Sequence, residues 1–228
     1  MDGHHRTERF TDDLRRLAEP IWAAQHAHPL VRGIGDGTLD LEKFAFWVRQ
    51  DYLFLIEYAR LFGLAAARAP DLETMGRFAE LLQATIGTEM DLHRGYAQQF
   101  GISPEELERE TPSPTTRGYT DFLLRTAAIG DFAELAAALL PCMWGFSEVG
   151  RRLAEGERPA DARYAAWVDM YADPEFAALA DWCRGLVDRL AEASSPITQR
   201  RMEEAFLTSS RYELAFWEMA WALERWSG

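Results

Sequence analysis

A cysteine and two acidic residues occupy positions that the helical pattern of the sequence assigns to the protein interior. Asp51 lies three residues after Val48 and four before Leu55, on one apolar stripe. Another stripe alternates spacings of three and four residues: Phe132, Leu135, Leu139, Cys142, Phe146, Val149 and Leu153. A buried carboxylate costs several kcal/mol unless it is paired, and a thiol can act as a nucleophile. These residue types predict a polar pocket among the helices.

Glu213 and two tyrosines extend this candidate set. Glu213 is flanked by Phe216 and Trp217 in the last helical segment, so partial burial is expected. Tyr119 and Tyr171 lie near the ends of shorter segments, from which a phenol can reach inward. Other interpretations stay open at this point. A structural hydrogen bond accounts for an inward Asp51, a buried cysteine is often a small apolar residue, and a tyrosine can be half-buried packing.

The elements that position these residues are predicted to be helices. Ala, Leu, Glu and Arg dominate, and no alternating run indicates a strand. We expect an all-α fold, a single-domain bundle of about eight or nine helices over residues 1–228, with residues 1–7 disordered. The predicted helices cover about residues 8–25, 41–68, 72–100, 116–129, 131–155, 164–171, 174–192 and 196–226, with a short one after Ser103. Residues 28–40 are predicted to be a loop, and Asp40 and Asp131 to be N-caps.

Composition excludes several classes of function. The formal net charge is −13 and basic residues form no run longer than a pair, so we expect neither nucleic-acid nor membrane binding. Two cysteines do not make a disulfide framework. The N-terminal segment is charged, and no apolar run is expected to span a bilayer. These features predict a cytoplasmic protein.

A metal or nucleotide site finds little support in the sequence. Glu89 and His93 lie one helical turn apart, but a carboxylate-bridged di-iron bundle needs further Glu-x-x-His pairs. The glycines of residues 28–40 follow no strand and precede no Lys-Ser or Lys-Thr, unlike a phosphate loop. We expect no metal and no cofactor.

Short motifs run in a fixed order from His28 to Trp226. They include Gln50-Asp51-Tyr52, Leu139-Leu140-Pro141-Cys142-x-Trp144 and Ser209-Ser210-x-Tyr212-Glu213-x-x-Phe216-Trp217. The series resembles the TenA/thiaminase II family, in its cysteine-containing class of aminopyrimidine aminohydrolases. Each motif alone has little specificity, whereas the ordered series covers most of the chain.

The resemblance implies a haem-oxygenase-like helical bundle that forms a homotetramer. It implies hydrolysis of 4-amino-5-aminomethyl-2-methylpyrimidine to hydroxymethyl-pyrimidine and ammonia, and/or cleavage of thiamine, in thiamine salvage, with neither cofactor nor metal. The family's nucleophile matches Cys142 and its catalytic glutamate matches Glu213. The carboxylate that binds the pyrimidine's exocyclic amine matches Asp51, and two pocket tyrosines match Tyr119 and Tyr171.

Two positions depart from the usual family pattern. Phe146 stands four residues after Cys142, where the family usually has a tyrosine, and Phe54 is aromatic without a hydroxyl. Both are expected to line the substrate pocket, which leaves the substrate range open. Two alternatives to the hydrolase remain: a non-catalytic pyrimidine-binding or regulatory protein, and a haem-oxygenase-like metal oxidase. A nucleophilic Cys142 is expected to have a lowered pKa.

Overall fold

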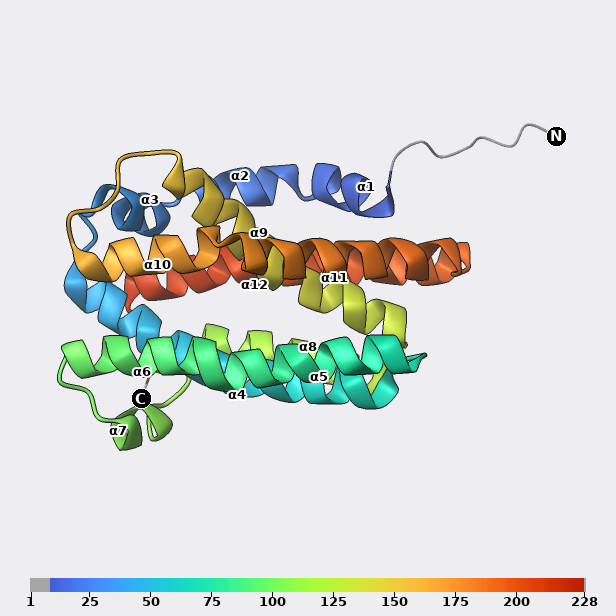
Figure 1. Ribbon diagram of the computed structural model, residues 1–228, viewed down its shortest axis with the longest axis horizontal. Coiled ribbons are helices and arrows are strands. Elements are labelled where there is room, and N and C mark those ends of the chain that lie inside the picture. Colours follow the sequence, from blue (N-terminus) through green and yellow to red (C-terminus); the bar gives the residue numbers. More distant parts are fainter. Residues whose placement is uncertain (1–8, 228) are drawn as a thin grey trace.

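The structure, a computed structural model, describes residues 9–227, and these form twelve α-helices, one π-helical turn and no strand (Figure 1). The bounds are α1 Phe10–Leu17, α2 Glu19–Ala27, α3 Pro29–Asp36, α4 Leu41–Arg68, α5 Leu72–Ala84, the π-helical turn η1 Thr85–Glu89, α6 Met90–Gln99, α7 Pro104–Glu108, α8 Pro114–Ile129, α9 Phe132–Ala154, α10 Ala162–Ala172, α11 Pro174–Glu192 and α12 Pro196–Ala222. The predicted disorder of residues 1–7 lies outside the described residues. The all-α prediction is confirmed for the part of the chain that is described.

Side-chain caps fix where most of the long helices begin. The carboxylate of Asp40 accepts a hydrogen bond from the Glu42 amide at the start of α4, and Asp131 does the same for Glu134 at the start of α9. Ser103 and Glu106 form the complete capping box of α7. Each such cap stabilises its helix by about 1 kcal/mol. The predicted starts of these helices are therefore confirmed.

Residues 28–40 were predicted to be a loop, and this prediction is wrong. His28 Nδ1 accepts a hydrogen bond from the Leu30 amide, Pro29 occupies the first turn, and α3 ends at Gly37 with φ 76°. A proline at the start and a left-handed glycine at the end are typical of a helix. Gly33 serves close packing, since a Cβ there would lie 3.0 Å from the Leu39 backbone.

Two other predicted helices are interrupted. The first divides into α1 and α2 at Ala18, with Pro20 in the first turn of α2. The predicted helix 72–100 runs through η1, whose wider turn separates α5 from α6. Such π-helical turns are rare and are frequent at functional sites. Glu89, the last residue of η1, is thereby turned toward the interior, as described below.

The inner helix α9 holds the molecule together. It crosses obliquely between the other long helices (Figure 1) and packs against α3, α4, α8, α10, α11 and α12. Helices α1–α3 cover one side of the bundle, and α5 and α6 lie on the opposite side (Figure 1). A Cβ on Gly150 of α9 would lie 2.4 Å from the Tyr171 carbonyl carbon. Glycine at this position therefore brings the end of α10, and with it Tyr171, directly onto α9.

Helix α9 is also long and apolar enough to cross a membrane, contrary to the sequence-based expectation that no segment is. Of its most apolar 18-residue window, 72% is buried within the protein. This burial is typical of the central helix of a helical core.

Candidate functional site

The thiol of Cys142 faces the interior from the middle of α9. Neighbours on its stripe, Leu139, Phe146 and Val149, are buried, whereas Cys142 itself is only half-buried. Cys142 packs against the core, and the carboxyls of Glu213, Glu89 and Asp51 lie close enough for their charges to act on the thiol. Pro141 precedes it without interrupting the helix.

Glu213 lies on α12, close to Cys142, and is 3% exposed. The Tyr119 hydroxyl, from α8, donates to Glu213 Oε1 at 2.5 Å and lies 2.8 Å from Ser209 Oγ. Glu213 also lies close enough to Cys142 for its charge to raise the pKa of the thiol. Helices α8, α9 and α12 thus bring a phenol, a carboxyl and a thiol close together.

Asp51 of α4 forms a buried ion pair with a residue that the pattern analysis did not assign to the site. His93 Nε2 lies 2.6 Å from Asp51 Oδ2, although the oxygen is off the direction of the ring N–H. His93 Nδ1 lies 2.9 Å from the Glu89 carbonyl oxygen, which can only accept, so Nδ1 carries a hydrogen. Burial lowers the pKa of His93, but Asp51 and Glu89 outweigh it and the pKa is raised. The neighbouring Asp51 and Glu89 therefore favour the protonated form of His93.

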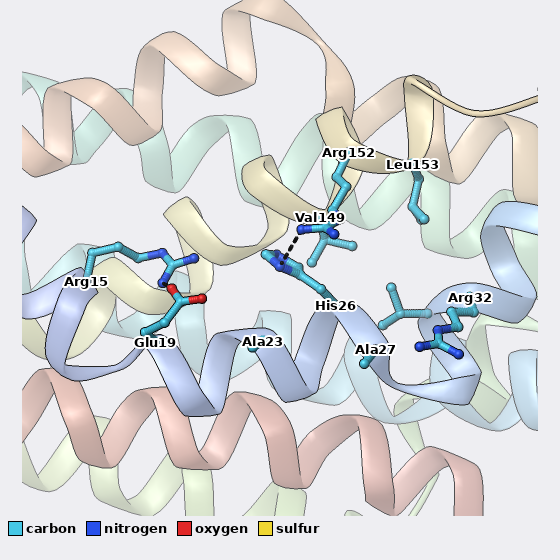
Figure 2. A pocket seen from close by; sticks show the side chains of 10 residues that line it. Arg15, Glu19, Ala23, His26, Ala27, Arg32, Val149, Arg152 and Leu153 are labelled. Atoms are coloured by element: carbon cyan, nitrogen blue, oxygen red, sulfur yellow. Dashed lines mark hydrogen bonds and ion pairs between the residues drawn. The ribbon is translucent and has the colours of Figure 1, made fainter.

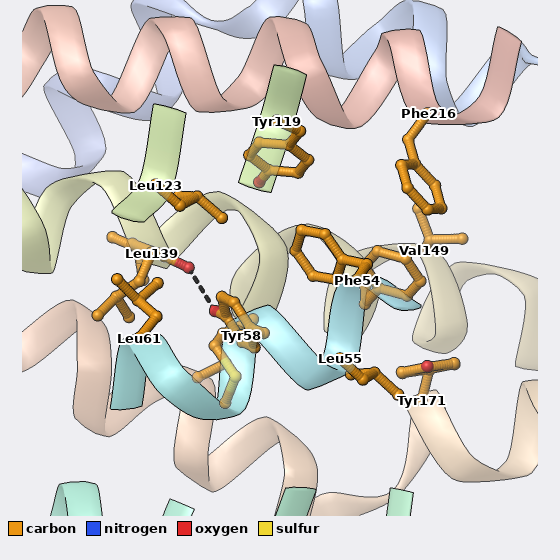
Figure 3. Close-up of a cluster of buried hydrophobic side chains, with 14 of the residues drawn as sticks. Phe54, Leu55, Tyr58, Leu61, Tyr119, Leu123, Leu139, Val149, Tyr171 and Phe216 are labelled. Atoms are coloured by element: carbon orange, nitrogen blue, oxygen red, sulfur yellow. Dashed lines mark hydrogen bonds between the residues drawn. The ribbon is translucent and has the colours of Figure 1, made fainter. Parts of the chain in front are cut away.

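Two more tyrosines, Tyr58 and Tyr171, belong to the cluster of buried side chains that Figure 3 shows. The Tyr58 hydroxyl donates to the Leu139 carbonyl oxygen at 2.8 Å and also contacts the Cys142 thiol. Tyr171 hydrogen-bonds to the carboxyl of Glu89. In Figure 3, Phe54, Tyr119 and Phe216 converge from α4, α8 and α12 beside Tyr58.

Aromatic rings pack against one another around these polar groups. Phe54 lies 5.0 Å from Tyr119 between ring centroids, and Phe146 lies 4.8 Å from Tyr171 and 5.1 Å from Trp217. Trp217 in turn stacks on Trp47 at 6.1 Å and 12°. Flat apolar walls around a few polar groups suit a flat heterocyclic ligand.

The protonation of the acidic groups is set mainly by burial. Burial raises the pKa of Glu213 to about 8, against the opposing hydrogen bond from Tyr119. It raises the pKa of Glu89 to about 7, against the nearby charge of His93. Burial, with the negative charges of Glu213, Glu89 and Asp51, holds the pKa of the Cys142 thiol well above its ordinary value. The expectation of a lowered thiol pKa is wrong for the protein without substrate, because carboxyls rather than cations surround the sulfur.

We predict that Glu213→Gln makes the protein more stable at alkaline pH. A carboxyl whose pKa is raised on folding binds more protons folded than unfolded, so stability falls as pH rises from about 4.5 to 8. The glutamine does not titrate. The melting temperature of the variant relative to the parent should therefore rise between pH 5 and pH 8.5 by at least about 2–4 °C, the equivalent of about one pKa unit. The exposed Glu204→Gln on the same helix is the control, and an equal rise there would contradict the prediction.

Contacts or charges link the seven residues predicted for the site to one another, and their role in a site stays a prediction. Glu89, His93, Ser209 and Tyr58 were not assigned to it. Cys183, the other cysteine, is buried in α11, and burial raises its pKa to about 12. Nothing in the sequence set Tyr58 and Ser209 apart, since both fit an apolar stripe. His93 could have been found, because it is a polar residue on the otherwise apolar face of its helix, where it is fully buried.

A separate hollow of about 500 Å³ lies between α1–α3 and α9 (Figure 2). Arg15 pairs with Glu19 and Glu148, and Arg152 lies 3.4 Å from His26. These polar groups largely satisfy one another, and no thiol lines the hollow. The residues around Cys142, and not this hollow, are therefore the candidate functional site.

The pair Glu89 and His93 does not form a metal site. Among residues 9–227 no group of three or more His, Cys, Asp or Glu side chains is arranged to hold a metal ion. His93 Nδ1 is directed at the Glu89 carbonyl oxygen, and Nε2 lies 2.6 Å from Asp51 Oδ2. The donor set therefore gives the metal-oxidase alternative no support.

Comparison with known proteins identifies the same family along nearly the whole chain. The TENA/THI-4/PQQC family profile matches residues 15–223. An aminopyrimidine aminohydrolase of Halalkalibacterium halodurans is 45% identical over 219 residues, which cover 96% of this chain and 98% of the relative. A TenA homologue protein from P. horikoshii OT3 superposes with a TM-score of 0.87 at 31% identity, covering 94% of this chain and 99% of the other. A protein of Shewanella denitrificans with a haem-oxygenase-like fold gives 0.72 at 11% identity over 95% and 94% of the two chains, which confirms the fold class alone.

Proposed function

Because the chain belongs to the TENA/THI-4/PQQC family, we propose that it is a hydrolase of thiamine salvage, an aminopyrimidine aminohydrolase. Its substrate is 4-amino-5-aminomethyl-2-methylpyrimidine, which it converts to hydroxymethyl-pyrimidine and ammonia through Cys142. Thiamine, which carries its leaving group on the same methylene carbon, is the second substrate. The observation that supports this most is the convergence of three groups: the carboxyls of Glu213 and Asp51 lie close enough to the Cys142 thiol to raise its pKa, and the Tyr119 hydroxyl donates to Glu213 at 2.5 Å.

Asp51 orients the pyrimidine in this proposal. Its Oδ2 faces the His93 imidazolium, which leaves Oδ1 to accept a hydrogen bond from the exocyclic amine of the ring. The aromatic walls, including Phe54 and Phe146, enclose the ring faces. Fixing the ring against the sulfur makes the attack effectively intramolecular.

The first chemical step joins the sulfur to the ring. Cys142 Sγ bonds to a ring carbon next to a nitrogen, and that nitrogen takes a proton from Glu213. The S–H proton passes to Glu213, so the carboxyl ends the step as it began. A carboxyl with a pKa of about 8 holds its proton at neutral pH and can serve as this acid. Tyr119, donating at 2.5 Å, holds the Glu213 carboxyl in place.

The second step exchanges the group on the methylene carbon. The electron pair now in the ring expels the leaving nitrogen, which takes up a proton and departs as ammonia. The oxygen of a water molecule bonds to the exposed methylene and loses a proton, which replaces the one that the ammonia took. The C–S bond then breaks, the ring regains its aromaticity, and the sulfur takes back a proton from Glu213 as the ring nitrogen returns its own.

The non-catalytic alternative retains one supporting observation, the raised pKa of the Cys142 thiol. A protonated thiol is a weak nucleophile, as expected of a pocket that only binds. In the hydrolase, the thiol instead loses its proton to Glu213 only once the pyrimidine is in place. The two proposals therefore differ in turnover and not in binding.

A product assay tests the proposal. We expect the purified protein to release hydroxymethyl-pyrimidine and ammonia in equal amounts from the aminomethyl compound, measured by chromatography and an ammonia assay. Thiamine in a parallel reaction compares the two leaving groups. Folded protein that binds the pyrimidine in calorimetry but forms neither product would support the non-catalytic alternative instead.

Family membership also supports three proposals about the protein's setting. The enzyme acts as a homotetramer, in the cytoplasm, and without a metal or cofactor. Sedimentation equilibrium measures the first directly, since each chain has a mass of 26.0 kDa.

A further inference from the structure

A groove lies between η1, the end of α5 and helices α9–α11. It encloses about 380 Å³ and is lined by Leu81, Ala84, Thr85, Thr88, Glu89, Met143, Met170, Asp173, Glu175, Phe176 and Leu179. Three of these residues are acidic and none is basic. An acidic groove with apolar walls favours a cation.

Glu89 lies between this groove and the residues around Cys142. It lines the groove, yet its charge acts on the Cys142 thiol and its own pKa responds to Asp51 and His93. Met143, which follows Cys142 on α9, lines the groove as well. Glu89 and Met143 therefore place one end of the groove beside the residues that surround Cys142.

Side chains from α10 and η1 hold the Glu89 carboxyl at the end of the groove. The Tyr171 hydroxyl of α10 hydrogen-bonds to it, and Thr85 Oγ1 lies 3.5 Å from Glu89 Oε2 across η1. The wide π-helical turn ends at Glu89, and the next turn carries His93 beside Asp51. The mechanism above uses Asp51, Cys142 and Glu213 but gives Glu89 no task.

The substrate itself indicates that task. Its exocyclic amine and its aminomethyl group occupy adjacent ring carbons. If Asp51 binds the first, the carboxyl next to Asp51 faces the second. Glu89 lies close enough to Asp51 for the charge of Asp51 to contribute to the raised pKa of Glu89.

We propose that Glu89 is a catalytic residue on the leaving-group side, which holds the departing nitrogen and supplies its proton, and that the released amine leaves through the groove. This inference rests on the proposed function. The proton shared by the Glu89 carboxyl and the aminomethyl nitrogen resides on nitrogen when the C–N bond breaks. The bonding pair goes with the nitrogen, which leaves as ammonia, and Glu89 remains as a carboxylate. The carboxylate then accepts a proton from the water whose oxygen bonds to the methylene carbon.

Glu89→Gln tests this assignment, because it keeps the shape and removes the transferable proton. We expect kcat/KM for the aminomethyl compound to fall by at least about 100-fold, as is typical of a lost acid or base. The inhibition constant of 4-amino-2,5-dimethylpyrimidine, which lacks the leaving nitrogen, should stay within about threefold. Thiamine cleavage should fall less than the reaction of the amine, since thiazole needs no proton to depart.

The outcomes separate this inference from the proposed function. Parent protein without turnover rejects the function itself. Active parent protein with an undiminished Glu89→Gln variant, or with equal losses for both substrates, overturns only the role of Glu89. A parallel loss in binding of the dimethyl analogue would indicate a structural role and would also overturn it. Glu80→Gln, an exposed change on α5 outside the groove, is the matched control and should leave all three readouts unchanged.

Discussion

Cys142→Ala should abolish turnover of the aminomethyl-pyrimidine while leaving the pyrimidine bound. In the proposed mechanism the sulfur forms the covalent bond with the ring, so we expect kcat to fall by at least about 10⁴-fold. Loss of a half-buried thiol removes little packing, so the melting temperature should change little. Initial rates, with calorimetry using the dimethyl analogue, measure the two effects separately.

The second cysteine provides a matched control. Cys183→Ala removes an equally uncharged thiol from α11, where burial raises its pKa to about 12. This variant should keep its activity and lose some stability, because Cys183 is 1% exposed in the core. Retention of more than a tenth of the activity in Cys142→Ala would contradict a covalent mechanism at that sulfur.

Asp51→Asn should have the second large effect. Asparagine keeps the size of the side chain but removes the charge that faces His93 at 2.6 Å. Truncating one partner of a buried charge pair costs about 2–5 kcal/mol, and the substrate's amine loses a charged acceptor as well. We expect kcat/KM for the aminomethyl compound to fall by at least about 100-fold, with KM rising, in steady-state measurements.

Asp188→Asn separates recognition from stability. Asp188 also belongs to a partly buried ion pair, with Arg9 at 2.7 Å, and accepts from the Thr11 amide, far from the candidate site. Both variants should lower the melting temperature, but only Asp51→Asn should raise KM. Normal kinetics in Asp51→Asn would show that the carboxylate supports only the fold.

Apolar stripes and caps predicted the inner helices well because both are local signals. The bounds of α4 and α11 agree with prediction, and Asp51, Cys142 and Glu213 face inward as their spacing indicated. The predicted end of the last helix, at Trp226, is wrong. Leu223 adopts φ 54° and ends α12 at Ala222, a left-handed cap that a leucine gives no reason to expect.

Glu89 was not assigned to the site because η1 interrupts the helical periodicity of its segment. A stripe followed from Phe78 and Leu81 at 3.6 residues per turn loses its register in η1, where the turn holds an additional residue. One residue rotates the following side chains by about 100° around the axis. The sequence showed the Glu89 and His93 pair, but Asp51 comes to it from α4 through tertiary packing alone.

The carboxyls around Cys142 also decide how the resting protein meets oxidants. Peroxide and alkylating agents react with the thiolate, and the sulfur here stays protonated until a ligand changes its surroundings. The idle enzyme is consequently shielded from sulfenic acid formation, although it carries a reactive type of side chain. Chemical damage is then confined to the brief interval in which the pyrimidine itself covers the sulfur.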